Sequence, residues 1–333
     1  MESLKPYHTF GLDVLADDIS VLENREDCVS FLRIRTPRVL LGGGSDVLFT
    51  ENFRGQVGLM RISGVDITED ASFYHVRASA GEIWHELVNS LTRQGIAGIE
   101  NLALIPGTCG AAPVQNIGAY GCEFSDFCEY VEAVDADGSV LRLEPAECGF
   151  GYRQSRFKGE WRDRLVITAI GLRLGRNWQP RLDYGPLRSL RDSPSLSPDE
   201  IMNRIIEIRR SKIPDPKVLG NAGSFFQNPV VDAGIHEELK RRYPDIPSYD
   251  LGDGHFKVPA GWLIDRAGLK GFRYNNAGVY EKQALILVNY GGAETSDLVR
   301  LAKHVMNCVK DMFGIMLHPE VRIFGETGEI SLD

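Results

Sequence analysis

The sequence predicts an α+β protein, because strand-like and helix-like segments follow one another without the regular alternation of a parallel α/β fold. Residues 57–67 and 74–78 alternate apolar and polar side chains, which is typical of strands. Residues 81–94 instead repeat apolar side chains at helical spacing, and Gly95 can end that helix. With 333 residues, the chain is long enough for two or three domains.

Composition indicates a folded protein whose thiols are free. No apolar run reaches the roughly 18 residues of a membrane span, and we find no export signal. The net charge of -9 argues against a general nucleic-acid binder. The 6 cysteines form no CxxC pair and the 7 histidines no HExxH motif. We therefore expect no metal site, no contact with a membrane or nucleic acid, and a cytoplasmic location.

The remaining elements are predicted from period and end signals. Ser197 to Glu200 form a capping box with proline at the first helical position, and that helix must stop before Pro214. A helix over 298–309 can end at Gly314. A last strand over 318–324 would place Glu320 and Arg322 on one face. Further strands are expected at 39–41, 130–134, 140–143, 165–174 and 284–288, with a hairpin turn at 135–139 and apolar segments at 47–49 and 259–269.

Two glycine-rich stretches are candidate ligand sites. Residues 105–121 contain four glycines and two prolines, which predicts a long ordered loop that lines a large, flat, polar-edged ligand. A plain surface connection is the alternative. Residues 42–46 (GGGSD) leave backbone N–H groups uncovered and could cradle a phosphate, or form a simple tight turn. They match neither GxGxxG nor the P-loop pattern.

Polar residues outside these loops could carry chemistry. Tyr152, Arg153 and Arg156 form either a solvated face or a site for a substrate carboxylate. Residues 219–229 present Ser224 on a tight turn without a GxSxG elbow, so Ser224 is either structural or a proton donor. Residues 175–198 are expected to be a mobile connection or a lid. A basic group forms either an anion site or a solvated helix end: Arg209, Arg210, Lys212 and Lys217.

Taken together, the order and spacing of these motifs resemble the UDP-N-acetylenolpyruvoylglucosamine reductase (UDP-N-acetylmuramate dehydrogenase) family over nearly the whole chain. The motifs are Gly42 to Asp46, Ile105 to Gly121, Tyr152-Arg153, the turn with Ser224, and the PEVR segment with Glu320. The YGPL segment around Tyr184 is similar to the longer subtype, in which a tyrosine loop covers the substrate.

The resemblance implies an FAD-binding region of the vanillyl-alcohol-oxidase (PCMH) type over residues 1–200, with two subdomains split near residue 57. An α+β substrate-binding domain would follow over 201–333, and its last strand, 318–333, could pack back on the FAD region. FAD would be bound noncovalently. NADPH would serve as co-substrate for the reduction of UDP-N-acetylglucosamine enolpyruvate to UDP-N-acetylmuramate in peptidoglycan synthesis.

The resemblance also implies residue roles. Arg153 and Glu320 would stabilise the enolate-like state formed when hydride adds to the vinyl carbon, and Ser224 would deliver the proton. The FAD-binding residues would be Gly42, Gly43, Gly44, Ser45, Asp46, Ile105, Pro106, Gly107, Thr108, Ala111, Ala112, Gln115, Ile117 and Gly118. The substrate-binding residues would be Tyr152, Tyr184, Lys212, Asn228 and Gln283.

Two positions depart from the family pattern. Asp46 stands where asparagine is usual, and Gln227 occupies a site that is often basic. We expect a monomer. Alternatives to the reductase are an FAD-dependent alcohol oxidase of the same fold and a flavin- or nucleotide-binding protein without turnover.

Overall fold

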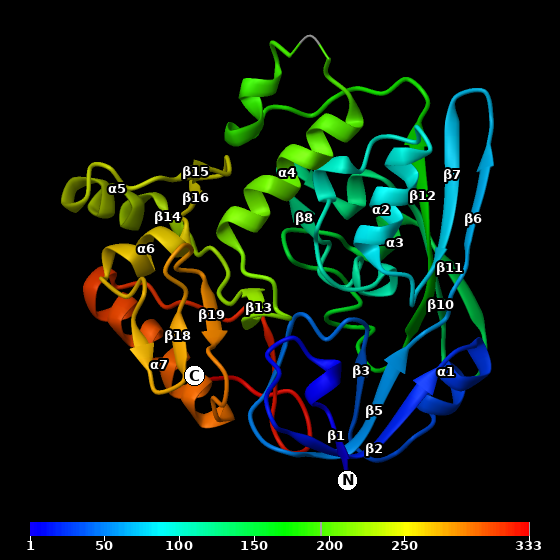
Figure 1. Ribbon diagram of the computed structural model, residues 1–333, viewed down its shortest axis with the longest axis horizontal. Coiled ribbons are helices and arrows are strands. Elements are labelled where there is room, and N and C mark those ends of the chain that lie inside the picture. Colours follow the sequence, from blue (N-terminus) through cyan, green and yellow to red (C-terminus); the bar gives the residue numbers. More distant parts are fainter. Residues whose placement is uncertain (194, 333) are drawn as a thin grey trace. The chain divides into compact units, whose positions relative to one another are not determined.

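The computed structural model describes residues 1–193 and 195–332, which form two compact units interleaved along the chain (Figure 1). Unit 1 comprises residues 1–17, 44–54 and 210–333, and unit 2 comprises residues 18–43 and 55–209. The unit boundaries fall within β2 (Leu15–Leu22), the loop at residues 42–46, β5 (Phe53–Met60) and α4 (Pro198–Lys212). The mixed helix and strand content confirms the α+β class.

Unit 2 is built around a five-stranded antiparallel sheet in the order β11-β10-β12-β7-β6. Figure 1 shows β6 and β7 as a hairpin at one edge of this sheet. The strands are β6 (Val65–Glu69), β7 (Phe73–Ser79), β10 (Cys128–Val134), β11 (Val140–Leu143) and β12 (Val166–Gly175). The other elements are α1 (Arg25–Leu32), β3 (Arg38–Leu41), α2 (Trp84–Arg93), η2 (Glu100–Leu102), η3 (Cys109–Ala111), β8 (Gly118–Ala119), β9 (Cys122–Glu123), η4 (Phe124–Asp126), α3 (Pro145–Cys148) and η5 (Gly185–Leu190).

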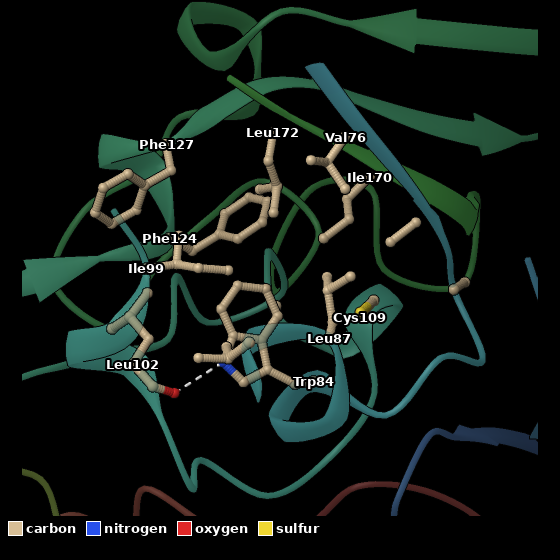
Figure 2. Close-up of a cluster of buried hydrophobic side chains, with 14 of the residues drawn as sticks. Val76, Trp84, Leu87, Ile99, Leu102, Cys109, Phe124, Phe127, Ile170 and Leu172 are labelled. Atoms are coloured by element: carbon tan, nitrogen blue, oxygen red, sulfur yellow. Dashed lines mark hydrogen bonds between the residues drawn. The ribbon is translucent and has the colours of Figure 1, made fainter. Parts of the chain in front are cut away.

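The core of unit 2 is centred on the indole of Trp84, at the start of α2 (Figure 2). Its ring packs edge-on against the Phe124 ring, with 6.2 Å between the ring centroids, and its Nε1 donates to the Leu102 carbonyl at 2.9 Å. Cys109 from the predicted 105–121 loop is fully buried in the same cluster. Burial of a large aromatic ring with its N–H satisfied contributes strongly to stability. The core therefore anchors the middle of this loop.

Most of the predicted elements of unit 2 are confirmed, with two corrections. The segment expected as one strand over 57–67 is two strands, β5 and β6, separated by residues 61–64; Gly64 there has a φ of +128° that ends the extended conformation. The capping box is half formed: the Glu200 N–H donates to Ser197 Oγ, but the Glu200 carboxylate accepts from the Ser193 hydroxyl. The predicted hairpin turn is confirmed, because Asp135 accepts from the N–H groups of residues 137 and 139.

Unit 1 contains an antiparallel sheet in the order β13-β19-β18-β17, a three-stranded sheet in the order β14-β16-β15, and the parallel pair of β20 with β4. The strands are β1 (Glu2–Ser3), β4 (Val47–Phe49), β13 (Gly220–Ser224), β14 (Val230–Asp232), β15 (Tyr249–Asp250), β16 (His255–Lys257), β17 (Arg273–Tyr274), β18 (Ala277–Val279), β19 (Ile286–Asn289) and β20 (Arg322–Phe324). The helices are η1 (Lys5–Tyr7), α5 (Ala233–Arg242), α6 (Ala260–Arg266) and α7 (Thr295–Phe313).

Helix α7 supplies much of the core of unit 1 (orange to red in Figure 1). The apolar face predicted from its period is buried, and Gly314 ends the helix in the left-handed conformation at φ +72°, as predicted. The predicted strand over 318–324 is wrong in its first half, because β20 begins only at Arg322. Pro319 lacks the N–H that a paired strand needs, and Glu320 precedes the strand.

Within 1–193 and 195–332, no cluster of three or more His, Cys, Asp or Glu side chains could hold a metal ion. None of the helices described there combines the length and apolar composition needed to cross a membrane.

His8, in the N-terminal segment of unit 1, is buried and is expected to make folding sensitive to acid. Its Nε2 lies 3.2 Å from the Leu12 carbonyl, and burial lowers its pKa to about 4 from 6.5. Between these values the unfolded chain binds a proton that the folded chain excludes, so stability falls as the pH falls from 6.5 towards 4. We expect wild type to lose about 2 kcal/mol more than His8→Gln between pH 7.5 and 5.0 in urea unfolding. Equal losses in the two proteins would contradict this assignment.

Candidate active site

The two glycine-rich stretches approach each other closely in unit 2. A Cβ added to Gly43 would lie 2.9 Å from the Gly107 Cα atom, and one added to Gly42 would collide with the Thr108 hydroxyl. Gly107 itself has a φ of +106°, a conformation that favours glycine. Only residues without a side chain allow the two backbones to lie this close. The structure thus brings together the predicted phosphate loop and the predicted ligand loop.

Backbone hydrogen bonds to the segment that connects β7 to α2 hold the 105–121 loop in place. The Cys109 N–H donates to the Glu82 carbonyl at 2.8 Å, and the Gly110 N–H to the Ala80 carbonyl at 2.9 Å. The Trp84 N–H in turn donates to the Gly107 carbonyl at 3.1 Å. The predicted ordered loop is therefore confirmed, although it contains the short turn η3 and one strand of the two-residue hairpin β8–β9, which the glycine content did not predict.

Several polar groups of these loops lack a protein partner. Thr108 Oγ1 and Gln115 Oε1 are buried without a hydrogen bond to any described residue. Among those residues, the N–H groups of Gly43, Gly44 and Ser45 also donate to no acceptor. Buried polar atoms cost free energy unless they are paired, so these groups indicate a polar ligand. Free N–H groups suit a pyrophosphate, and the hydroxyl and amide suit the polar edges of a flavin, so the residues fit FAD.

Arg153 lies at the tip of a tight turn in unit 2. The Gly151 N–H donates to the Gln154 carbonyl and the Gln154 N–H to that of Gly151, which leaves Tyr152 and Arg153 at the turn. Arg153 has a φ of +52°, which is uncommon for a residue with a side chain and is often found at functional sites. Its guanidinium donates to the Gly118 carbonyl at 2.9 Å and lies 5.4 Å from the Tyr152 ring. The turn therefore holds Arg153 against the ligand loop.

A second arginine adds positive charge near Arg153. Burial lowers the pKa of the Arg209 guanidinium on α4, while Tyr120 opposes that shift and Arg153 reinforces it. Burial also raises the pKa of Tyr120. Two guanidinium groups in a partly desolvated environment favour an anionic ligand such as a carboxylate. This finding favours the anion-site interpretation of Arg209.

Ser224 and Glu320 lie on neighbouring segments of unit 1. The predicted tight turn around Ser224 is wrong: Ser224 ends β13, where a bulge between Asn221 and Ser224 and the φ of +69° at Gly223 bend the strand. The Glu320 N–H donates to the Phe225 carbonyl at 2.8 Å. Ser224 is exposed, whereas Phe225 is fully buried, so the hydroxyl is presented by a fixed backbone. The structure brings these two residues together within unit 1, and Arg153 belongs to unit 2.

The predicted substrate residues are also divided between the units. In unit 2, the exposed Tyr184 ring meets Tyr120 edge-on at 5.4 Å, next to the fully buried Leu187. The Asn101 amide donates to the carbonyls of Tyr120 and Arg181 and so ties the Tyr184 segment to the ligand loop. Pro194, in the expected lid over 175–198, lies outside the described residues.

The three remaining substrate residues belong to unit 1. Asn228 Oδ1 accepts from the Ala260 N–H at 2.9 Å, at the start of α6. Gln283 Oε1 accepts from the Leu285 N–H, and Lys212 is exposed at the end of α4.

Asn116, which the sequence motifs did not single out, connects two segments of the candidate site. Its fully buried amide donates to Glu123 at 2.7 Å and to the Gly151 carbonyl at 3.2 Å, which connects the ligand loop to the Arg153 turn. Its φ is +44°. Asparagine tolerates this conformation better than most residues, so an asparagine inside a glycine-rich loop could have indicated a left-handed turn at this position.

Comparisons with known proteins agree with this geometry. The family described as "FAD binding domain" matches residues 22–144, and "UDP-N-acetylenolpyruvoylglucosamine reductase, C-terminal domain" matches residues 215–324. A solved structure of UDP-N-acetylenolpyruvylglucosamine reductase from Thermus caldophilus shares the fold, with a TM-score of 0.69 and 24% identity over 97% of both chains. The predicted fold class, an FAD-binding region followed by a second α+β domain, is confirmed.

Curated relatives match over almost the whole chain. UDP-N-acetylenolpyruvoylglucosamine reductase of Shewanella oneidensis is 50% identical, covering 99% of this chain and 98% of the relative. The protein of the same name from Salmonella typhimurium is 47% identical, covering 99% and 97%. The chain therefore belongs to the UDP-N-acetylenolpyruvoylglucosamine reductase family.

Proposed function

We infer that this protein uses NADPH and FAD to reduce UDP-N-acetylglucosamine enolpyruvate to UDP-N-acetylmuramate in peptidoglycan synthesis. It is thus an FAD-dependent oxidoreductase acting on a CH–CH group. The relatives named for this reaction are about half identical to it over nearly their full length. The observation that carries the inference is the pair of glycine-rich loops whose buried polar atoms have no partner among the described residues.

FAD would be held by the two glycine-rich loops. The N–H groups of Gly43, Gly44 and Ser45 point to a pyrophosphate site, because they are not used within the described chain. Thr108 and Gln115 would pair with polar edges of the flavin. FAD would carry electrons from NADPH to the substrate when bound. Neither loop contains a histidine that could form a covalent bond to FAD, so we propose noncovalent binding.

The chain's own residues would handle the negative charge and the proton. The Arg153 guanidinium can form two parallel hydrogen bonds to the substrate carboxylate, and Glu320 would hold the enolate-like state through a protonated or hydrogen-bonded carboxyl. The Ser224 hydroxyl would then donate its proton to carbon, which is feasible because an enolate is the stronger base. The fixed backbone at Phe225 would keep Ser224 and Glu320 in position.

The nucleotide sugar would be bound by Tyr152, Tyr184, Lys212, Asn228 and Gln283. The exposure of Tyr184 and its contact with Tyr120 support a tyrosine segment that covers the substrate, as in the longer subtype. Asp46 would place a carboxylate near the pyrophosphate and weaken one FAD contact. Because Gln227 is uncharged, Lys212 and Lys217 would supply the positive charge for the UDP phosphates.

We propose that residues 1–200 form the FAD-binding region, split near residue 57, and residues 201–333 the substrate-binding domain. The two family matches, 22–144 and 215–324, fall inside these ranges. The parallel pair of β20 with β4 supports the packing of the last strand on the FAD region. We further propose that the protein acts as a monomer in the cytoplasm.

The function is tested by following flavin colour through both half-reactions. The purified protein is expected to be yellow and to release its colour on acid precipitation. In a stopped-flow instrument, NADPH should bleach the flavin and the enolpyruvyl sugar should restore the colour. Colour retained in the pellet would contradict noncovalent binding. Bleaching of the flavin by an alcohol, with recolouring by dioxygen, would favour an oxidase, and a flavin that NADPH does not bleach would favour a binding protein.

A further inference from the structure

A closed ring of backbone hydrogen bonds in unit 1 connects the proposed phosphate loop to the proposed proton-donating residues. The ring passes through four short segments: residues 44–46, Thr9, residues 221–225 and residues 320–322. All four belong to unit 1. The N-terminal segment was not assigned any role by the sequence motifs.

Thr9 closes one side of the ring. Its N–H donates to the Gly44 carbonyl at 3.0 Å, and its carbonyl accepts from the Asn221 N–H at 3.1 Å. One residue therefore touches both the phosphate loop and the strand that ends at Ser224. A Cβ on Gly44 would collide with the Tyr7 carbonyl, so the N-terminal segment lies directly against the loop.

The other side of the ring passes through Glu320. The Glu320 N–H donates to the Phe225 carbonyl at 2.8 Å, one residue after Ser224. Two residues later, the Arg322 N–H donates to the Asp46 carbonyl at 3.1 Å and returns to the phosphate loop. Ser224 and Glu320 therefore lie on a path of hydrogen bonds and backbone that starts at the Gly44 carbonyl and returns to the Asp46 carbonyl of the same loop.

Burial around Thr9 makes these bonds stiff. The Phe10 carbonyl accepts from the buried Asn289 amide at 2.9 Å, and the Phe10 ring meets Phe225 edge-on at 6.4 Å. The Asn221 amide donates to the Leu219 carbonyl at 2.8 Å, and its oxygen accepts from the Gly223 N–H at 3.0 Å. Close-packed segments of this kind transmit small displacements instead of absorbing them.

We propose that Thr9 is a positioning residue that couples occupation of the phosphate loop to the placement of Ser224 and Glu320. The proposal rests on the proposed function, because it takes the anion at Gly44 and Ser45 to be the FAD pyrophosphate. An anion bound to the Ser45 N–H orders the Gly44–Ser45 peptide, whose carbonyl accepts from Thr9, and restrains the next residue, Asp46, whose carbonyl accepts from Arg322. The bound cofactor thereby orders the two residues that handle the substrate proton and charge.

The coupling is tested first by removing the hydrogen bonds from Thr9 to Gly44. Thr9→Pro deletes the N–H that bonds to the Gly44 carbonyl and also the Thr9 hydroxyl, which donates to the same carbonyl at 3.4 Å; the extended conformation of His8 (φ -141°, ψ 148°) suits a residue before proline. Thr9→Ser keeps both donors and is the matched control. We expect Thr9→Pro to weaken FAD binding roughly tenfold and to slow recolouring by the enolpyruvyl sugar roughly tenfold at saturating FAD. Bleaching by NADPH should change less than about twofold, and Thr9→Ser should behave as wild type.

Hydrogen exchange of the wild-type protein tests the coupling without a substitution. Adding FAD should slow exchange at the amides of Asn221, Glu320 and Arg322. The Tyr290 amide, which donates to the Asn276 carbonyl in the same unit but outside the ring, should be unaffected. This measurement decides the question if Thr9→Pro fails to fold.

The outcomes separate the coupling from the proposed function. Unchanged FAD affinity and an unchanged recolouring rate in a folded Thr9→Pro protein would overturn the coupling. Equal hydrogen exchange at the amides of Asn221, Glu320 and Arg322 with and without FAD would also overturn it. If FAD binds and slows hydrogen exchange at these three amides, but the sugar does not recolour the flavin, only the proposed reaction would be overturned. A wild-type protein that binds no FAD would overturn both.

Discussion

Ser224→Ala is expected to leave bleaching of the flavin by NADPH nearly intact while slowing recolouring by the enolpyruvyl sugar by roughly 10²–10⁴-fold. That range is the usual contribution of a positioned general acid. The two rates separate because reduction of the flavin needs no proton from Ser224. The hydroxyl is exposed at the end of β13, so its removal leaves no cavity in the core. The half-reactions must be timed separately in a stopped-flow instrument.

A second substitution controls for a structural effect of Ser224→Ala. Ser224→Cys places a thiol at nearly the same position, and a thiol can also donate a proton, so part of the lost rate should return. If Ser224→Ala recolours at the wild-type rate, the proton comes from another group or from water. Ser224 would then be only the residue that ends a bulged strand.

Arg153→Lys is expected to slow recolouring by roughly 10²-fold, the usual cost of losing one donor that stabilises a developing oxyanion. Lysine keeps the positive charge but cannot form the two parallel hydrogen bonds of a guanidinium. It would also change the hydrogen bond to the Gly118 carbonyl that holds the side chain against the ligand loop. The measurement is the recolouring rate as a function of sugar concentration.

Arg156 provides the matched control for this substitution. It is exposed, three residues from Arg153, and its guanidinium lies 3.7 Å from the Glu160 carboxylate. Exposed ion pairs of this kind contribute little, so Arg156→Lys should recolour at the wild-type rate. Near-normal recolouring in Arg153→Lys, or an equal loss in both variants, would remove Arg153 from the reaction.

Local signals predicted the elements that local interactions determine. Helices α2 and α7 were predicted because their apolar period and their C-terminal glycine are properties of consecutive residues. The hairpin of β10 and β11 was predicted because Asp135 satisfies the turn's own N–H groups. In each case the partner lies within a few residues, so the sequence pattern contains the interaction.

Features that depend on distant partners could not be predicted in this way. The bulge before Ser224 exists because β13 pairs with β19, and no pattern in residues 219–229 encodes that register. Glu320 precedes β20 because Pro319 interrupts the predicted strand. The positive φ of Arg153 depends on the bonds that close its turn, and a sequence gives no indication of strain at an arginine.

The glycine loops lie between these two cases. Their composition predicted backbone exposure, and the N–H groups of Gly43 and Ser45 provide it, because they have no acceptor among residues 1–193 and 195–332. Their meeting at Gly43 and Gly107 is a tertiary contact and became visible only in the structure. Composition thus predicted backbone exposure, and the fold determined which parts of the two loops meet.

The parallel pair of β4 and β20 sets a constraint on synthesis of the chain. Thr50, beside β4, bonds to Phe324 in β20, 274 residues later. At roughly 5–20 residues per second, translation leaves β4 without its partner for on the order of half a minute. During that time its three apolar side chains, all buried in the native protein, remain exposed on the nascent chain. The β4 side of unit 1 can therefore form only after β20 has been synthesised, because β20 is the partner of β4 in its sheet.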